Sequence, residues 1–121
     1  MSAAAWVAVG LLGGLAAGAR FLLDAEVSAF ARGRFPFGIL AVNLSGALAL
    51  GIVAGAGLDG EALVIVAGGG IGSFTTFSTW ILDSHRLQRG GHLDLALLNV
   101  GVSLLAGFAA VALGHWLGTL A

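Results

Sequence analysis

Long apolar stretches alternate with short polar connections along the chain. A helix that crosses a bilayer needs about 20 mostly apolar residues, and stretches of that length occur four times. They cover residues 3–23, 37–58, 61–82 and 93–117. The pattern therefore predicts an all-α membrane protein with four transmembrane helices.

The polar connections between these spans are short and cover residues 24–36, 59–60 and 83–92. Pro36 suits the first turn of a helix, where its missing N–H costs nothing. None of the connections is long enough to separate two domains, so we expect residues 1–121 to form a single domain. The first span has no positive charge before it, so we expect it to be retained and not cleaved as a signal peptide.

Composition supports lipid as the solvent of this chain. Hydrophobic residues make up 59% and charged residues 9%, and the mean hydropathy is +1.04. A soluble domain carries about 25% charged residues. There is no cysteine and no basic tract, which argues against thiol chemistry and nucleic-acid binding. No carboxylate lies in the middle of a span and the histidines are near span ends, so we expect the protein not to be an enzyme.

All the positive side chains are arginines, and they lie in or beside the first and third connections. Both termini and the second connection carry none. Because positive residues favour the cytoplasmic side, we expect a multi-pass protein of the cell membrane with both termini outside. The arginines are Arg20, Arg32, Arg34, Arg86 and Arg89.

The third predicted span is rich in glycine and hydroxyl groups from Gly68 to Trp80. Four of the five residues 68–72 are glycine, and each glycine costs a helix about 1 kcal/mol relative to alanine. We therefore expect a Gly-rich break in this span. Backbone carbonyls freed by a break can hold a hard cation such as Na⁺ or line an ion path.

If a helix resumes after the break, Ser73, Thr76, Phe77 and Trp80 share one face at helical spacing. Hydroxyl donors and the positive edges of aromatic rings could together solvate a small anion. Hydroxyls in helices also bond back to carbonyls of their own helix. The density of this cluster favours the functional interpretation.

Other polar positions leave two interpretations open. Asn43 could donate to an anion or clasp a neighbouring helix, and Asn99 and Ser103 could line a path or bond between helices. For Arg20 an interfacial anchor is favoured over a vestibule that concentrates anions. Small residues at four-residue spacing predict close helix packing. These small residues are Gly10–Gly14–Gly18, Ala47–Gly51–Gly55 and Ser103–Gly107.

Three motifs occur in a characteristic order. Arg20 ends the first span, residues 42–46 read Val-Asn-Leu-Ser-Gly, and residues 75–80 read Thr-Thr-Phe-Ser-Thr-Trp. Over the whole chain this order resembles the Fluc (CrcB) family of fluoride channels, in which the corresponding motifs are Gly-x-x-x-Arg, Val-Asn-x-x-Gly and Thr-Thr-Phe-Ser-Thr-Phe. Ala16 stands where the first motif has its glycine, so that match is partial.

The resemblance implies a passive, fluoride-selective channel that exports cytoplasmic fluoride and is built as an antiparallel, dual-topology dimer in the lipid. It implies a structural Na⁺ at the dimer centre, not transported, held by the backbone carbonyls of Gly72 and Thr75. It also implies a fluoride pore, with Arg20 in a vestibule or structural role and Asp83 as an acidic residue frequent in the family. The expected pore residues are Asn43, Thr76, Phe77, Trp80 and Ser103.

Some positions depart from the family pattern. Trp80 replaces a phenylalanine, and Asn99 stands where tyrosine is frequent. The arginine bias exceeds that expected of a subunit inserting both ways, so a homologous partner of opposite bias is an alternative to a homodimer. Two other functions remain open: a small multidrug-type proton-coupled exporter, which needs a titratable carboxylate mid-span, and a regulatory or structural subunit of a heteromeric channel.

Overall fold

The structure is a computed structural model that describes all residues, 1–121. It contains three continuous long helices, α1 (Ala3–Ala31), α2 (Phe37–Gly55) and α6 (Leu93–Thr119). Between α2 and α6 lies an interrupted helix, Gly60–Arg89. All four units are long and apolar enough to cross a membrane, which confirms the predicted all-α architecture with four spans. The interrupted helix consists of α3 (Gly60–Leu63), the π-helix η1 (Val64–Ile71), α4 (Gly72–Phe74) and α5 (Phe77–Arg89).

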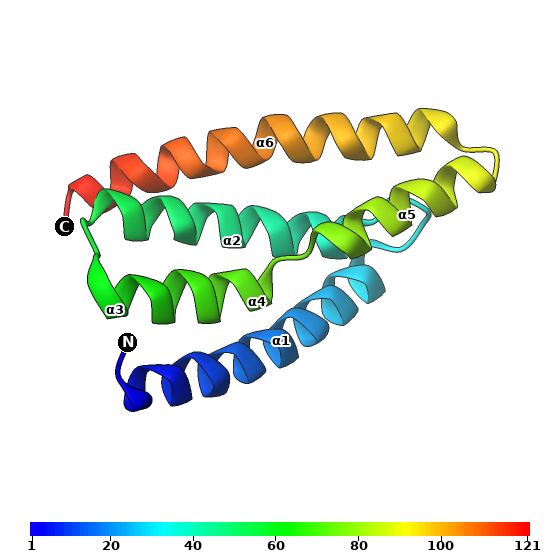
Figure 1. The fold of residues 1–121 in the computed structure, drawn as a ribbon. Helices are drawn as coiled ribbons and strands as arrows, with labels where there is room; N and C mark the ends of the chain where they lie inside the picture. The colour runs from blue at the N-terminus through cyan, green and yellow to red at the C-terminus, as the bar shows by residue number, and fades with distance from the viewer.

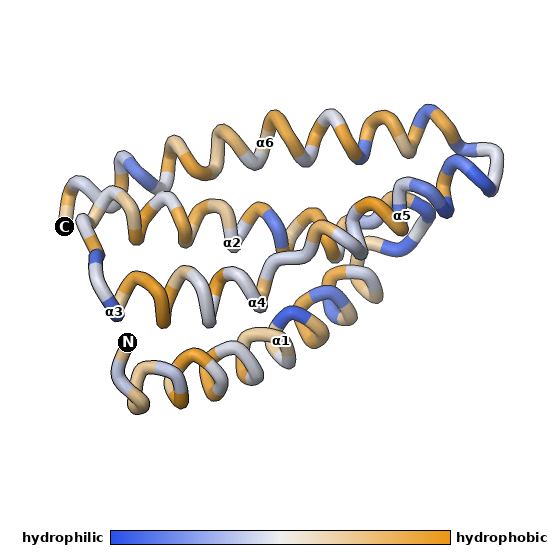
Figure 2. Tube along the Cα trace, viewed as in Figure 1, coloured by the Kyte–Doolittle hydropathy of each residue, from blue (hydrophilic) through white to orange (hydrophobic).

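The helices run antiparallel to their neighbours in sequence, so the two chain termini lie at one end of the bundle (Figure 1). The connections after α1 and after α5 lie at the opposite end, where hydrophilic positions gather (Figure 2). The helix α1 continues to Ala31, beyond the expected end at Leu23. No glycine or proline interrupts residues 24–31, and the Ser28 hydroxyl donates to Asp24 Oδ1 at 3.1 Å across one helical turn.

The helices α2 and α6 share the most extensive contact in the bundle, and glycines allow their backbones to approach closely. A Cβ atom on Gly51 would overlap the carbonyl oxygen of Val111, and one on Gly114 would overlap that of Leu48. The close packing predicted for the stripe in the second span is therefore confirmed. By contrast, Gly10, Gly14, Gly18 and Gly107 have no atom within 4 Å of such a Cβ, so the packing expected of these residues is not found within one chain.

The position predicted for the break in the third span is wrong. Residues 68–72 stay helical, and the extended residues are Thr75 (φ −79°, ψ 159°) and Thr76 (φ −145°, ψ 123°). The glycines instead let η1 approach α1, because a Cβ on Gly69 would lie 3.1 Å from the Cα of Val9. The helix thus ends just after the glycine run and resumes as α5.

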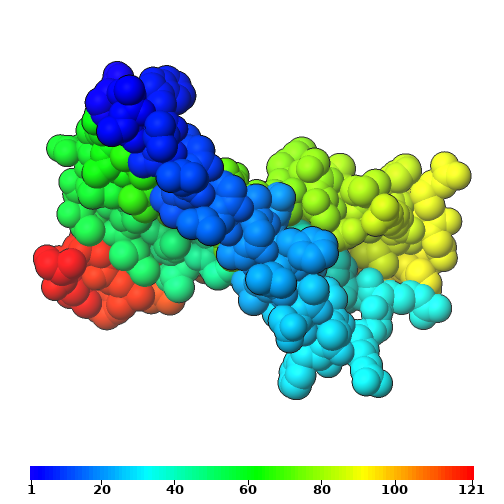
Figure 3. Space-filling view, turned by 90° about the horizontal axis from the view of Figure 1, so that it is seen from below, coloured from blue at the N-terminus to red at the C-terminus, as the bar shows by residue number.

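The helix α5 is covered mainly by α6. Viewed from below, α5 and the C-terminal half of α1 diverge and leave a gap between them (Figure 3). The packed part of the bundle is therefore the half formed by α2, α6, η1 and the first half of α1.

Candidate functional site

The interruption before α5 is held by a side chain from another helix. Asn43, about two turns into α2, donates from Nδ2 to the Thr76 carbonyl at 2.9 Å and accepts from the Thr76 N–H at 2.9 Å on Oδ1. Of the two interpretations left open for Asn43, the structure favours the clasp between helices. Its second Nδ2 hydrogen has no acceptor within the chain and remains available.

Hydroxyl groups complete the interruption locally. The Thr75 hydroxyl donates to the Ile71 carbonyl at 3.0 Å. The Thr76 hydroxyl accepts the Thr79 N–H at 3.2 Å and caps α5. In a continuous helix that N–H would bond to the Thr75 carbonyl, which now accepts no hydrogen bond within the chain.

The interruption also divides the expected stripe of donors and aromatic rings. Ser73 lies against α1, where a Cβ on Gly13 would meet its hydroxyl at 3.0 Å. The expectation that Ser73 shares a face with Thr76, Phe77 and Trp80 is wrong, because the two extended residues reorient the chain before α5. The rings of Phe77 and Trp80 remain together, with centroids 5.5 Å apart and planes at 74°.

Two cavities share Asn43 and Trp80. One has a volume of about 150 Å³ and is also lined by Ser103, with Leu40, Leu44, Leu104 and Gly107 forming the rest of its wall. The other, of about 290 Å³, is also lined by Thr76 and Phe77. The structure therefore brings the expected pore residues around two cavities with common walls.

A buried hydrogen-bond network joins α5 to α6. Trp80 Nε1 donates to the Asn99 carbonyl at 3.4 Å, and Asn99 Nδ2 donates to the Ser84 hydroxyl at 2.9 Å. Ser84 donates in turn to the Trp80 carbonyl at 3.0 Å, and Ser103 donates to Asn99 Oδ1 at 3.5 Å. Sequence reasoning missed Ser84. Its position one turn after Trp80, in a predicted polar connection, concealed that it is buried.

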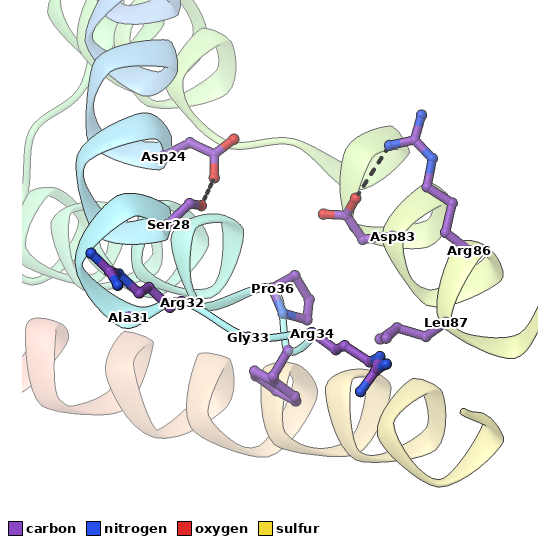
Figure 4. A pocket seen from close by; sticks show the side chains of 11 residues that line it. Asp24, Ser28, Ala31, Arg32, Gly33, Arg34, Pro36, Asp83, Arg86 and Leu87 are labelled. Carbon is purple, nitrogen blue, oxygen red and sulfur yellow. Dashed lines mark hydrogen bonds and ion pairs between the residues drawn. The ribbon is translucent and has the colours of Figure 1, made fainter. Parts of the chain in front are cut away.

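Arg20 and Asp83 lie apart from these cavities. Arg20 is half-buried on α1 and forms no ion pair within the chain. Asp83 pairs with Arg86 at 3.8 Å and lines a separate cavity of about 310 Å³ at the connection end. There Asp24 on α1 lies across the opening from Asp83 and Arg86 on α5 (Figure 4). This cavity mixes both signs of charge.

Known proteins match this chain over nearly its whole length, and the matches agree with one another. A family model described as "CrcB-like protein, Camphor Resistance (CrcB)" matches residues 7–115. A Mycobacterium bovis protein named "Fluoride-specific ion channel FluC 2" is 39% identical over 99% of this chain and 95% of its own length. Symbiobacterium thermophilum has two relatives. The relative named "Fluoride-specific ion channel FluC 1" is 42% identical over 90% of this chain and 96% of its own length. The relative named "Fluoride-specific ion channel FluC 2" is 46% identical over 85% of this chain and 88% of its own length.

Proposed function

Because the chain belongs to the CrcB family, we propose that it forms a passive, fluoride-selective channel, not an enzyme, that exports cytoplasmic fluoride across the cell membrane. The observation that carries the proposal is the pair of cavities that share Asn43 and Trp80. They gather donors and aromatic rings from α2, α5 and α6 near the middle of the spans. The relatives named as fluoride-specific channels supply the identity of the ion.

Fluoride is small and strongly hydrated, so its path must replace water with donors that bind weakly enough to release it. The free N–H of Asn43 and the hydroxyl of Ser103 are such donors. The edge of Phe77 adds a partial positive charge without a full cation. Apolar walls between these donors make the path narrow and dehydrating.

The interruption before α5 supports the same proposal. It starts α5 inside the membrane span, where the positive end of the helix dipole favours an anion. The Thr76 hydroxyl is engaged in capping this helix. We therefore assign Thr76 to the wall of the path and to the shape of the interruption.

We propose that the channel is an antiparallel dimer. Phe77 is 71% exposed in the single chain, although it borders the second cavity. The stripe Gly10–Gly14–Gly18 is uncovered, and small residues on membrane helices support close association. The partner is a second copy or a homologous subunit, and the arginine bias favours the homologue.

We further propose that a structural Na⁺ lies at the dimer centre. The Thr75 carbonyl has no hydrogen-bond partner, and Gly72 lies one turn before it. These neutral oxygens suit a hard cation, which binds several oxygen ligands, so a partner subunit would supply others. The ion would fix the interruption and carry no current. Arg20, which forms no ion pair within the chain, would anchor α1 at the membrane interface or raise the anion concentration at a vestibule.

A proton-coupled exporter is the alternative function, and it needs a carboxylate in the middle of a span. Asp24 and Asp83 instead border the cavity at the connection end.

The proposed function is tested by reconstituting the chain in liposomes and following external fluoride with an electrode. We expect efflux that needs no proton gradient and excludes chloride, that is weakened in Ser103→Ala, and that is unchanged in Ser45→Ala. Efflux that depends on a proton gradient would support the exporter. Absence of efflux would support a structural subunit or indicate that a partner subunit is missing.

A further inference from the structure

Asn99 is the buried junction between two proposed pore residues. Its side chain and backbone are 1% exposed. Its carbonyl accepts from Trp80 Nε1 at 3.4 Å, and its Oδ1 accepts from Ser103 at 3.5 Å. The side chain is anchored at its other end, where Nδ2 donates to Ser84 at 2.9 Å. Asn99 therefore connects the aromatic wall of the smaller cavity with its hydroxyl donor.

The direction of these bonds follows from the single proton of each hydroxyl. Ser84 donates its proton to the Trp80 carbonyl at 3.0 Å, so it can only accept from Asn99. The amide nitrogen of Asn99 must then face Ser84, and the amide oxygen must face Ser103. Without an ion, the Ser103 proton consequently points to Asn99.

An anion in the cavity competes for that proton. Ser103 lines the smaller cavity with Asn43 and Trp80. Its bond to Asn99, at 3.5 Å, is longer than the usual range of about 2.5–3.0 Å and is easily released. Building on the proposed function, we propose that Asn99 is a positioning residue that sets the fluoride affinity of the channel by holding the Ser103 hydroxyl until the anion takes it.

The side chain of Asn99 can be removed without removing the anchors of Trp80. The indole bonds to the backbone carbonyl of Asn99, which every substitution retains. Ser84 also keeps its bond to the Trp80 carbonyl. A leucine at position 99 therefore deletes the acceptor for Ser103 and leaves the aromatic wall in place.

The test is a double-mutant cycle between Asn99→Leu and Ser103→Ala. Replacing Trp6 and Trp116 by phenylalanine leaves Trp80 as the single tryptophan, and both replaced side chains are exposed. Half-saturating fluoride concentrations are measured from Trp80 emission in purified protein and from flux in liposomes. We expect Asn99→Leu to lower this concentration about threefold, as for loss of one weak competing hydrogen bond. Ser103→Ala should raise it, and Asn99→Leu should have no effect in that background.

Ser84→Ala is a second route to the same result that leaves Asn99 in place. It removes the acceptor of Nδ2 and loosens the side chain, so we expect a smaller shift in the same direction, again absent with Ser103→Ala. Ser45→Ala is the matched control, because that serine also donates to a carbonyl of its own helix and does not contact Asn99. If Asn99→Leu does not fold, Ser84→Ala decides the outcome.

The outcomes separate this inference from the proposed function. Flux in the unmodified chain, together with no shift or with a shift that persists in Ser103→Ala, overturns the role of Asn99 and leaves the channel intact. A second outcome is no flux together with a Trp80 emission that depends on fluoride and that Asn99→Leu shifts only when Ser103 is present. This outcome supports the role of Asn99 and rejects conduction by this chain alone. Absence of both flux and an emission response overturns the role of Asn99 and also rejects a fluoride channel formed by this chain alone.

Discussion

Asn43 and Thr76 exchange two hydrogen bonds, each 2.9 Å long, between α2 and the start of α5. The amide side chain occupies both the N–H and the C=O of one residue, as a neighbouring strand would. A non-helical backbone inside a membrane is tolerated only where such partners satisfy it. The clasp is thus the physical condition for the interruption that the proposed path requires.

The first prediction concerns this clasp. Asn43→Ala leaves the N–H and C=O of Thr76 without partners, so we expect a loss of about 1–3 kcal/mol in unfolding free energy. Denaturant unfolding in detergent, followed by circular dichroism, measures it. Ser45→Ala is the control, because its hydroxyl bonds only within α2. Equal stability of the two variants would show that the clasp is dispensable.

The second prediction concerns the glycines between α2 and α6. A Cβ in Gly51→Ala would overlap the Val111 carbonyl, so the helices must separate, at a cost of about 1–3 kcal/mol. Gly101→Ala on α6 meets no atom within 4 Å and should stabilise the helix by up to about 1 kcal/mol. Thermal unfolding of both variants in detergent checks this contrast. A neutral Gly51→Ala would mean that the two helices are not in close backbone contact.

The helices could be predicted from sequence because lipid imposes a simple rule of length and apolarity. The position of the interruption could not, since it depends on a partner from another helix. The glycines at residues 68–72 predict a weak helix, but two of them, Gly69 and Gly70, instead let α1 pack closely against this helix. The chain becomes extended only where Asn43 reaches Thr76. Ser73 was misplaced for the same reason.

The candidate site could be predicted as a set of residues but not as a set of contacts. Asn43, Trp80 and Ser103 were identified, and the structure places them around one cavity. The spacing of Asn99 and Ser103 left two interpretations open, because a helical face can meet either a helix or a cavity. Their network with Ser84 requires the crossing of α5 and α6, which no local pattern encodes.

The third prediction concerns the departure at Trp80. Trp80→Phe removes the indole donor to the Asn99 carbonyl and enlarges the cavity that the ring borders. If the indole narrows the proposed path, maximum fluoride flux in liposomes should rise, while the free energy of unfolding falls by about 0.5–1.5 kcal/mol. Trp116→Phe, at an exposed position, is the control and should change neither quantity. An unchanged or lower flux in Trp80→Phe would argue that the indole does not restrict the path.

The fourth prediction concerns the proposed Na⁺. A ligand that binds only the folded state stabilises it by about 2.7 kcal/mol at one hundred times its dissociation constant. We therefore expect the melting temperature in detergent to rise saturably with Na⁺ when N-methylglucamine is replaced at constant ionic strength. K⁺, which is larger, is the control and should be less effective. An equal response to all three cations would indicate screening of charge and no bound ion.

The last prediction concerns orientation. The connections after α1 and α5 carry Arg32, Arg34, Arg86 and Arg89 and share one end of the bundle, opposite both termini (Figure 1). If charge sets the topology, the whole population should insert with this end in the cytoplasm. The chain has no cysteine, so single cysteines introduced as Ala121→Cys and Gln88→Cys report on each end separately.

A membrane-impermeant thiol reagent added to intact cells should label Ala121→Cys and leave Gln88→Cys unlabelled until the cells are opened. Both side chains are exposed, so burial does not protect either site. Labelling at position 121 only would mean that two copies cannot face opposite ways, and an antiparallel channel would then need a homologous subunit. Comparable labelling of both positions would instead establish dual topology, and a homodimer would be sufficient. The orientation of this one chain therefore decides between the two partners proposed for it.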